Sequence, residues 1–480
     1  MRIVLIHYHL RPGGVTQVLF HQATALREAG EEVLILSGES PPLAETWTRI
    51  PVAVVPGLQY DRYRPVEIAG PVHRHTSVEK LARSIENAIH SRWPGTGADL
   101  VHVHNPLIRK NSLLIGAIKI LTEHYPLLLQ NHDLAEDFRP DVYFDGEYPA
   151  NCHYGVINSR DYRFLLEAGL KPEGLHLLPN EVQELSVTPG LPKTWYLYPV
   201  RGIRRKNIGE ALFLSLFTKL PIAITQPPTT EQDMPIYRRW KKTMEELKLP
   251  IEFEAGLESS FADVIGSAEA VITTSVKEGF GFSFLEPWTA GLAVTGRRIN
   301  YVCTDFEEAG IKLDDLYPVL SIPAEYAEPA KLRKKTAEAL IRVYTAFGLS
   351  LPPQIHGELD QVFSQDFCDF GIMDEEIQEK TLRLAVQNKT VREQIKKANP
   401  FLEALAELKI DSSLVDANRL AVLSAYSRKN ILSTILEAYR KTFIPVTQYI
   451  SRSRLLELYL DPARLSLVGI SPPEPPKGAV

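Results

Sequence analysis

The stretch RIVLIHYHLRPGGVTQVLFHQATALREAGEEVLILS, residues 2–37, contains two apolar runs separated by a glycine turn and a segment with helical spacing. The runs RIVLIH and EEVLILS are rich in Ile, Val and Leu, and they have the length of strands that are buried on both faces. Two such runs joined by a helix form a βαβ unit, whose strands pair in parallel. The sequence therefore predicts a parallel α/β sheet at the start of the chain.

The same rhythm continues along the chain and then restarts. We expect further strands in the first part at Val52–Val55, Leu100–His104, Leu127–Asn131, Gly155–Asn158 and Leu175–Pro179. Residues 181–193, EVQELSVTPGLPK, lose apolar periodicity and gain Pro and Gly, as linkers between domains do. Beyond them come the predicted strands WYLYPV, PIAITQ, IEFEA and AVITTS. After about residue 325 we expect helices only, at 326–347, 373–388 and 418–443.

Length and composition agree with two domains. The chain has 480 residues, of which 44% are apolar, and this exceeds what one hydrophobic core usually holds. We predict Rossmann-like domains at 1–185 and 194–425, with a helical insertion at about 305–415. The segment 444–480 is predicted to be a tail, because its end, SPPEPPKGAV, is too rich in proline for helices or strands.

Charge and cysteine content exclude several classes of function. A formal net charge of −6 gives no basis for binding nucleic acid, which needs clustered Lys and Arg. Three scattered cysteines, Cys152, Cys303 and Cys368, fit a reducing cytoplasm better than a disulfide framework. The most apolar stretch, 113–129, is interrupted by charged and polar residues and is not expected to span a membrane, which leaves peripheral contact as the only membrane role.

The segment SVKEGFGFSFLEPWTAG, residues 275–291, follows a predicted strand and leads into a helix. Gly279 and Gly281 let backbone N–H groups approach a phosphate, and the helix N-terminus adds a favourable dipole. Glu286 can accept hydrogen bonds from the vicinal hydroxyls of a ribose, whereas Glu278 precedes the turn and is expected to face a sugar. The alternative is an ordinary glycine turn followed by a solvated carboxylate.

A second segment, PVRGIRRKNIGEAL at 199–212, places Arg201 and Lys206 on a short loop between a strand and a helix. Cations at the carboxyl edge of a parallel sheet complement a diphosphate. The alternative is a solvated basic loop that also includes Arg204 and Arg205. Fixed cations can replace Mg²⁺ at a diphosphate, so we predict no metal requirement.

In the first domain, the turn HYHLRPGGVTQVL places Gly13 and Gly14 before a helix, with an ordinary turn as the alternative. His132 and Asp133 follow a predicted strand, where ligands of open α/β sheets bind, and they are candidates for contacting sugar hydroxyls. A metal site made of His102, His104 and His132 is disfavoured, because these histidines lack compact ligand spacing.

Together these segments resemble the glycosyltransferase family 4 group of the GT-B fold. Residues 275–291 resemble its signature of two acids eight positions apart, and 199–212 resemble its strand, Arg, loop, Lys and helix. RPGGVTQVL, VHVHNP, QNHDL and the segment at 156–182 are similar to the corresponding parts of its N-terminal domain, in the same order. Pro287 and Trp288 stand where small residues are more usual. The stretch from roughly 305 to 415 also departs from the family core.

The resemblance implies an α/β fold of GT-B type, with the two domains facing a central cleft and a helix at 426–443 closing back on the first. It implies a retaining glycosyltransferase, typically of hexoses, that uses a nucleotide diphosphate sugar and no other cofactor. The acceptor would be a small molecule, a glycan or a lipid-linked compound. The motifs leave the base, the sugar, the acceptor and the oligomeric state open.

The residue roles implied by this resemblance fall into three sets. The catalytic set is His132, Glu278, Arg201 and Lys206. The donor-binding set is Gly13, Gly14, Arg201, Lys206, Glu278, Gly279, Phe280, Gly281, Phe282 and Glu286. The acceptor-side candidates are His9, His104, Asn105 and Asp133.

Two other functions suit the same scaffold. A phosphorylase or a nucleotide-sugar epimerase is the first, because a fold does not choose its reaction. The second is a catalytically silent protein that binds a nucleotide sugar or acts as a scaffold through its helical third.

Overall fold

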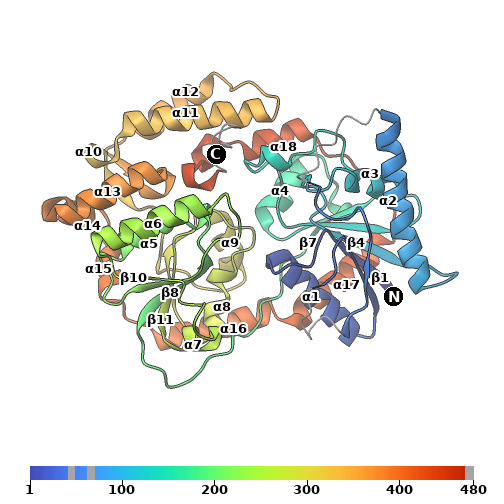
Figure 1. The fold of residues 1–480 in the computed structure, drawn as a ribbon, viewed down its shortest axis with the longest axis horizontal. Coiled ribbons are helices and arrows are strands. Elements are labelled where there is room, and N and C mark those ends of the chain that lie inside the picture. Colours follow the sequence, from blue (N-terminus) through green and yellow to red (C-terminus); the bar gives the residue numbers. More distant parts are fainter. Residues whose placement is uncertain (42–48, 62–70, 471–480) are drawn as a thin grey trace. The chain divides into compact units, whose positions relative to one another are not determined.

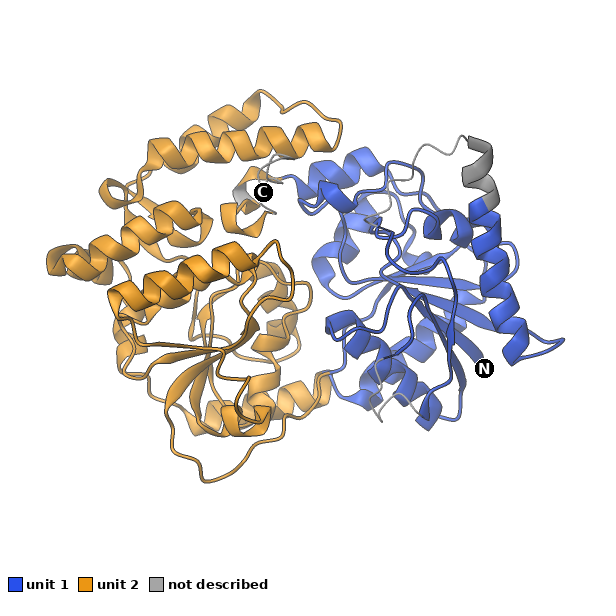
Figure 2. Ribbon diagram, viewed as in Figure 1, with its two compact units in different colours: residues 1–181, 426–460 blue, residues 182–425, 461–480 orange. Residues whose placement is uncertain are grey.

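The computed structural model describes residues 1–41, 49–61 and 71–470, and these form two compact units (Figure 2). Of the described residues, unit 1 contains those of Met1–Glu181 and Tyr426–Leu460, and unit 2 contains those of Val182–Ala425 and Asp461–Ile470. The chain thus passes from one unit to the other at Glu181, within the segment 181–193 in which we predicted a linker. The proline-rich end, 471–480, lies outside the described residues.

Unit 1 is built on a seven-stranded parallel sheet with the strand order β3-β2-β1-β4-β5-β6-β7. The strand bounds are β1 Arg2–His7, β2 Glu32–Ser37, β3 Val52–Val54, β4 Leu100–His104, β5 Leu127–Asn131, β6 His153–Val156 and β7 Leu175–Leu177. The helices are α1 Gly14–Glu28, α2 Pro71–Arg92, α3 Leu114–Leu121, α4 Ser159–Glu167, α17 Arg428–Thr442 and α18 Arg452–Tyr459 (Figure 1). The four residues from Ile3 to Ile6 are fully buried, as the continuous apolar run of β1 predicts for a central parallel strand.

Unit 2 repeats this design with a six-stranded parallel sheet in the order β10-β9-β8-β11-β12-β13. Its strands are β8 Trp195–Arg201, β9 Ile222–Gln226, β10 Ile251–Phe253, β11 Ala268–Thr273, β12 Val294–Arg297 and β13 Leu316–Tyr317. The helices of this part are α5 Ile208–Leu214, α6 Met234–Leu247, α7 Phe261–Gly266, α8 Glu286–Thr289 and α9 Asn300–Glu308. The order is that of a Rossmann sheet, which confirms the predicted fold class for both halves.

The strand order fixes where a ligand can bind. In unit 1 the order reverses between β1 and β4, and in unit 2 it reverses between β8 and β11. At such a point the two loops that leave the carboxyl ends of the neighbouring strands run to opposite sides, which opens a crevice between them. The loops after β1, β4, β8 and β11 contain most of the residues proposed from the sequence.

The helical part of unit 2 contains α10 Ala324–Ala327, α11 Pro329–Ala346, α12 Gln354–Phe363, α13 Glu375–Gln387, α14 Lys389–Ala398, α15 Phe401–Ala406 and α16 Ser412–Ala425. It also contains β14, Ser321–Pro323, which pairs antiparallel with β15, Phe367–Asp369. The expectation that strands stop at about residue 325 is therefore wrong for β15. Strands this short give only a weak pattern, and the sequence revealed some of them, such as β3 and β10, but not β12 to β15.

The C-terminal region differs from its predicted outline. The helical pattern at 418–443 is divided into α16 and α17, and Ser427 caps α17 by accepting a hydrogen bond from the Asn430 amide at 3.5 Å. Helix α17 contacts α1 and β5 within unit 1. The predicted tail is wrong where α18 forms, because Leu455, Leu456 and Tyr459 place a buried face against α4. Among the residues that the structure describes, no helix has both the length and the apolar character needed to cross a bilayer.

A buried ionic network joins the sheet of unit 2 to its helical part. Arg297, at the end of β12, makes two hydrogen bonds of 2.8 Å to Glu210 of α5 and bonds of 2.7 and 2.8 Å to Asp369 of β15. The Tyr317 hydroxyl also donates to Glu210, at 2.6 Å. Arg297 and Glu210 are almost fully buried, so each charge depends on its partner for solvation.

Replacement of Arg297 by Met is expected to lower the free energy of unfolding by about 3–5 kcal/mol, because it leaves the buried carboxylate of Glu210 without its cation. Its neighbour Arg298 offers a matched control, since Arg298 pairs with Glu307 at the surface. The Arg298→Met change should cost about 0–1 kcal/mol. Urea unfolding of both variants checks this, and equal losses would contradict the role given to the network.

Candidate active site

The two signature segments of unit 2 meet through an ion pair. Lys206 ends the short 3₁₀ helix η4, Arg204–Lys206, which follows β8, while Glu278 lies on the loop after β11. The Lys206 Nζ donates to Glu278 Oε1, and Arg205 Nη1 lies 3.2 Å from Glu278 Oε2 and 2.9 Å from the Lys277 carbonyl. Glu278 therefore holds two cations at the switch point between β8 and β11.

Buried hydroxyl groups fix the backbone on both sides of this ion pair. The Tyr198 hydroxyl donates to the Lys206 carbonyl at 2.7 Å, and Thr274 Oγ1 donates to the same carbonyl at 3.0 Å. On the other side, the Tyr301 hydroxyl accepts from the Glu278 amide at 3.2 Å and donates to the Glu278 carbonyl at 2.5 Å. The pair is thus held in place by parts of both loops and of α9.

The charges of the pair stabilise each other. Burial raises the pKa of the Glu278 carboxyl, but the charges of Lys206 and Arg205 outweigh this effect, and its pKa lies below the ordinary value. Burial lowers the pKa of the Lys206 ammonium, and the charge of Glu278 offsets part of that shift. The lowered pKa keeps Glu278 ionised at neutral pH, and its carboxylate favours the charged form of the Lys206 amine beside it.

The turn that follows Glu278 contains Gly279 and Gly281, and it requires glycine at position 281. Gly281 has φ +96°, and a Cβ atom there would lie 2.7 Å from the Cγ1 of Val302. The turn leads into a 3₁₀ helix, η5, at Phe282–Phe284. The Phe280 and Phe282 rings meet edge to face at 5.0 Å, with Phe280 buried and Phe282 half-buried.

Glu286, the second acid, begins α8 and is half-buried. Among the described residues, its carboxylate has no hydrogen-bonding or ionic partner. Burial raises the pKa of the Glu286 carboxyl to about 7 from the ordinary 4.5, and no neighbouring charge opposes the shift. A partly desolvated carboxylate without a protein partner is what a site for sugar hydroxyls requires, because the ligand then supplies the missing hydrogen bonds.

Arg201 does not join this cluster. It ends β8, where the register shifts across Pro199 and Val200, since a proline in a central strand cannot donate to the ladder. Arg201 then pairs with Gln226 of β9 and donates from Nε to its side chain at 3.4 Å, the one hydrogen bond of Arg201's side chain within the described part of the chain. Its role in binding a diphosphate stays a prediction.

Arg205 and Tyr301 are the contributors that sequence reasoning missed. Arg205 was visible in the basic loop, where its position next to Lys206 is the only signal. Tyr301 gave no signal, because it is 23 residues from Glu278 and only the fold brings the two together.

In unit 1, the predicted histidines form a stacked row at the ends of β4 and β5. The rings of His104 and His132 stack at 5.5 Å, with His104 Nδ1 3.1 Å from His132 Nε2. His102 stacks on His104 at 4.3 Å, and its Nδ1 lies 2.8 Å from the Tyr439 hydroxyl of α17. Burial lowers the pKa of His102 to about 3 and that of His132 to about 4, so these rings are neutral at pH 7.

Asn105 organises the turn that carries His132 and Asp133. It adopts φ +57°, and its side-chain oxygen accepts from the His132 amide at 3.1 Å and from the Asp133 amide at 3.2 Å. Asp133 also pairs with Arg139 at 3.3 Å. The structure thus brings together four of the proposed residues, His104, Asn105, His132 and Asp133.

The glycine turn after β1 leaves the start of α1 open. Gly13 precedes α1 in an extended conformation and gives it no side-chain cap, and a Cβ atom on Gly14 would meet nothing within 4 Å. Among the residues that the structure describes, no side chain caps the first amide groups of α1, and such groups at a helix N-terminus suit an anion. His9, on the same turn, stacks edge to face on His7 at 5.1 Å and on Tyr60 at 4.7 Å.

Within residues 1–41, 49–61 and 71–470, no three His, Cys, Asp or Glu side chains are arranged as a metal-ligand set.

The raised pKa of the Glu286 carboxyl predicts that the free energy of unfolding depends on pH. Because its folded-state pKa is raised, the folded protein keeps a proton that the unfolded chain loses, and stability should fall as pH rises from 4.5 to about 7. Replacement of Glu286 by Gln should abolish this part of the slope. Urea unfolding at several pH values checks it, with Glu338→Gln on the exposed side of α11 as the control. Identical slopes in the wild type and the Glu286 variant would contradict the assignment.

Comparison with known proteins gives one curated relative and many similar folds, while no family model matches the chain. The chain is 25% identical over 419 residues to mannosylglucosyl-3-phosphoglycerate synthase of Petrotoga mobilis, a match that covers 79% of this chain and 80% of the relative.

Three solved structures illustrate the fold similarity. A glycosyltransferase of Rickettsia africae ESF-5 gives a TM-score of 0.52 at 14% identity, covering 92% of this chain and 98% of its own. Sucrose-phosphate synthase of Thermosynechococcus elongatus gives a TM-score of 0.54 at 15% sequence identity, and the match covers 92% of this chain and 99% of the synthase. HepE of Anabaena in complex with UDP gives a TM-score of 0.51 at 12% sequence identity, and the match covers 91% of this chain and 99% of HepE. The chain therefore has the two-domain Rossmann-like fold of GT-B glycosyltransferases.

Proposed function

We propose that this protein is a retaining glycosyltransferase that moves a sugar, most simply a hexose, from a nucleotide diphosphate donor to an acceptor hydroxyl. The observation that carries the proposal is the cluster of Lys206, Arg205 and Glu278 beside the Gly281 turn. It lies where the sheet of unit 2 reverses its strand order, the position at which such sheets bind nucleotides.

The cluster suits a leaving diphosphate. As the bond between the sugar C1 and the phosphate oxygen breaks, negative charge develops on the diphosphate, and a fixed ammonium and guanidinium stabilise it. The acceptor oxygen attaches to C1 on the face that the diphosphate leaves, and its proton passes to the departing phosphate. The amides of residues 279–281 would bind the same phosphates, and Glu286 would accept hydrogen bonds from the ribose hydroxyls.

The comparisons support the same chemistry. The curated relative is a synthase of a mannosylglucosyl compound, and the similar folds include a second sugar synthase and a protein bound to UDP. In unit 1, His132 and Asp133 would contact the transferred sugar, while His9, His104 and Asn105 would lie on the acceptor side. Neutral histidines suit this role, because a neutral ring both donates and accepts hydrogen bonds.

A catalytically silent nucleotide-sugar-binding protein is the alternative. The unpartnered carboxylate of Glu286 serves binding equally well, so a chemical readout must separate the two functions. Slow hydrolysis of the donor in the absence of an acceptor favours the enzyme, and its complete absence across all donors favours the binding protein. A phosphorylase would instead form a sugar phosphate when free phosphate is supplied.

Replacement of Lys206 by Ala should reduce kcat/KM by about 10²–10³, since it removes a cation aimed at the developing charge. Product formation with UDP-, GDP- and ADP-sugars measures this, and the anomeric configuration of the product, read by NMR, tests retention. Lys242→Ala is the control, because Lys242 is a highly exposed lysine on α6 of the same unit. Full activity of the Lys206 variant with every donor would exclude the proposed diphosphate site.

We further propose that the acceptor is anionic and carries a phosphate, as the name of the curated relative indicates for that protein. A cationic group lies at the switch point of unit 1. Lys110 Nζ lies 3.1 Å from the Tyr60 hydroxyl, over the same ring that His9 contacts. Arg11, on the β1 loop, pairs with Glu39 at the surface, a contact that a phosphate can replace at small cost.

Replacement of Lys110 by Ala should raise KM for glucosyl-3-phosphoglycerate by about ten- to hundredfold, because a charge-assisted hydrogen bond is lost. The same glycoside without its phosphate should bind the wild type and the variant alike. Initial rates with both acceptors check this, and Lys119→Ala, on the exposed side of α3, is the control. An equal change for both acceptors would contradict a phosphate contact.

A further inference from the structure

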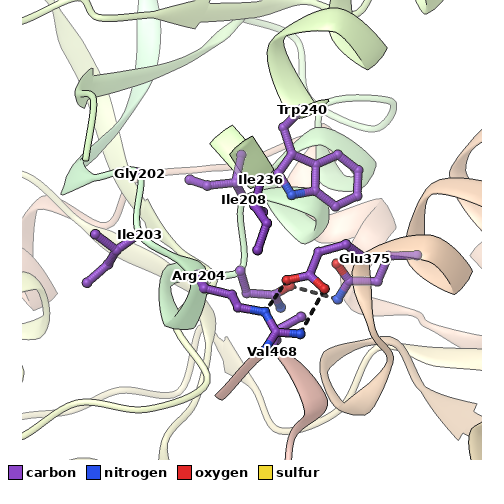
Figure 3. Close-up of a pocket in the computed structure, with 10 residues that line it drawn as sticks. Gly202, Ile203, Arg204, Ile208, Ile236, Trp240, Glu375 and Val468 are labelled. Carbon is purple, nitrogen blue, oxygen red and sulfur yellow. Dashed lines mark hydrogen bonds and ion pairs between the residues drawn. The ribbon is translucent and has the colours of Figure 1, made fainter. Parts of the chain in front are cut away.

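Arg204 lies two residues before Lys206, yet its side chain has a different set of partners. Its Nε and Nη2 donate to the two oxygens of Glu375, the second bond being 2.9 Å long (Figure 3). Its Nη1 donates to the Ile470 carbonyl. The side chains of Arg204 and Glu375 are 14% and 10% exposed. Because the Arg204 guanidinium is mostly buried and makes two hydrogen bonds to the Glu375 carboxylate, it fixes the position of the loop.

The residue on the other side of Lys206 is held by the same helix. Asn207 adopts the left-handed conformation with φ +51°, and its side-chain oxygen accepts from Gln378 Nε2 at 2.8 Å. Gln378 and Glu375 both belong to α13, one turn apart. The loop is therefore tied to α13 on each side of Lys206, through the side chains of Arg204 and Asn207.

The C-terminal segment Ser466–Ile470 completes this anchor within unit 2. Leu467, Val468 and Ile470 are buried, and the Ser466 hydroxyl donates to the Gly371 carbonyl at 2.6 Å. Val468, Arg204 and Trp240 line a small cavity of about 10 Å³, which has room for about one water molecule, and Val468 lies beside Arg204 (Figure 3). The C-terminal segment therefore packs closely against Arg204 and its neighbours.

The segment also reaches the second loop of the site. A Cβ atom on Gly469 would lie 3.6 Å from Val276 Cγ2, and the Val276 amide donates to the Arg205 carbonyl at 3.1 Å. Val276 is two residues before Glu278. The C-terminal segment thus packs against both loops whose side chains form the Lys206–Glu278 ion pair.

We propose that α13 and residues 466–470 form a clamp that positions Lys206 for the donor diphosphate, with Arg204 as its central positioning residue. This inference rests on the proposed function of the Lys206 site. A lysine side chain has many rotamers, and ordering it at the moment of binding costs affinity. A clamp that fixes the loop beforehand removes part of that cost, so its loss should weaken donor binding more than it slows the chemical step.

The test compares nucleotide binding by calorimetry in four variants, using whichever of UDP, GDP and ADP binds the wild type most tightly. Arg204→Ala and Val468→Ala should each raise Kd, the first by about ten- to hundredfold, as loss of a partner that orients a ligand-binding group commonly does. Arg204→Lys should recover only part of the affinity, because an ammonium cannot be bidentate. Arg239→Ala is the control, since it removes an exposed ion pair with Glu379 of the same α13.

The kinetic readout separates positioning from general destabilisation. The clamp variants should raise the donor KM while kcat falls by a smaller factor. If Arg204→Ala fails to fold, Glu375→Gln and Val468→Ala provide the same comparison. Unchanged Kd in the folded clamp variants, while Lys206→Ala abolishes binding, would overturn the clamp alone. Unchanged binding in Lys206→Ala itself would overturn the proposed function as well.

Discussion

The ion pair between Lys206 and Glu278 is the interaction on which the candidate donor site depends. Two buried opposite charges are favourable only when their geometry is fixed, and here four hydroxyl and guanidinium contacts fix it. The Lys206 ammonium thus lies at the carboxyl edge of the sheet and is paired with the Glu278 carboxylate. A diphosphate that enters can share this cation with Glu278, whereas a lone buried lysine would lose its proton.

The rest of unit 2 fixes the position of that ion pair in two ways. The strand order brings the loops after β8 and β11 together, which is a property of the fold. The helical insertion then fixes the loop through Glu375 and Gln378, and the network around Arg297 joins the insertion to the sheet. The long helical part of unit 2 thus contacts the loop of the candidate donor site directly.

Unit 1 presents a different chemistry at the equivalent edge of its own sheet. Its stacked histidines are neutral because they are buried, and Asn105 holds the turn that carries His132 and Asp133. Neutral hydrogen-bonding groups suit sugar hydroxyls, and in our proposal Lys110 and Arg11 would supply positive charge for an anionic acceptor. The charged edge of the sheet in unit 2 and the mainly polar edge of the sheet in unit 1 therefore differ in the chemistry that they offer to a ligand.

The sequence by itself determined the fold class, because alternating apolar runs and helical segments encode a parallel α/β sheet locally. It also indicated Lys206, Glu278 and the Gly281 turn as candidates for the site, since these lie next to recognisable strands. Only the tertiary structure decided that Arg205 joins the pair while Arg201 faces Gln226, because a register shift at Pro199 changes which side chain points where. The contacts of Tyr301, Glu375 and Ile470 were equally beyond the sequence, since residues far apart in the chain meet only after packing, and no local pattern records that meeting.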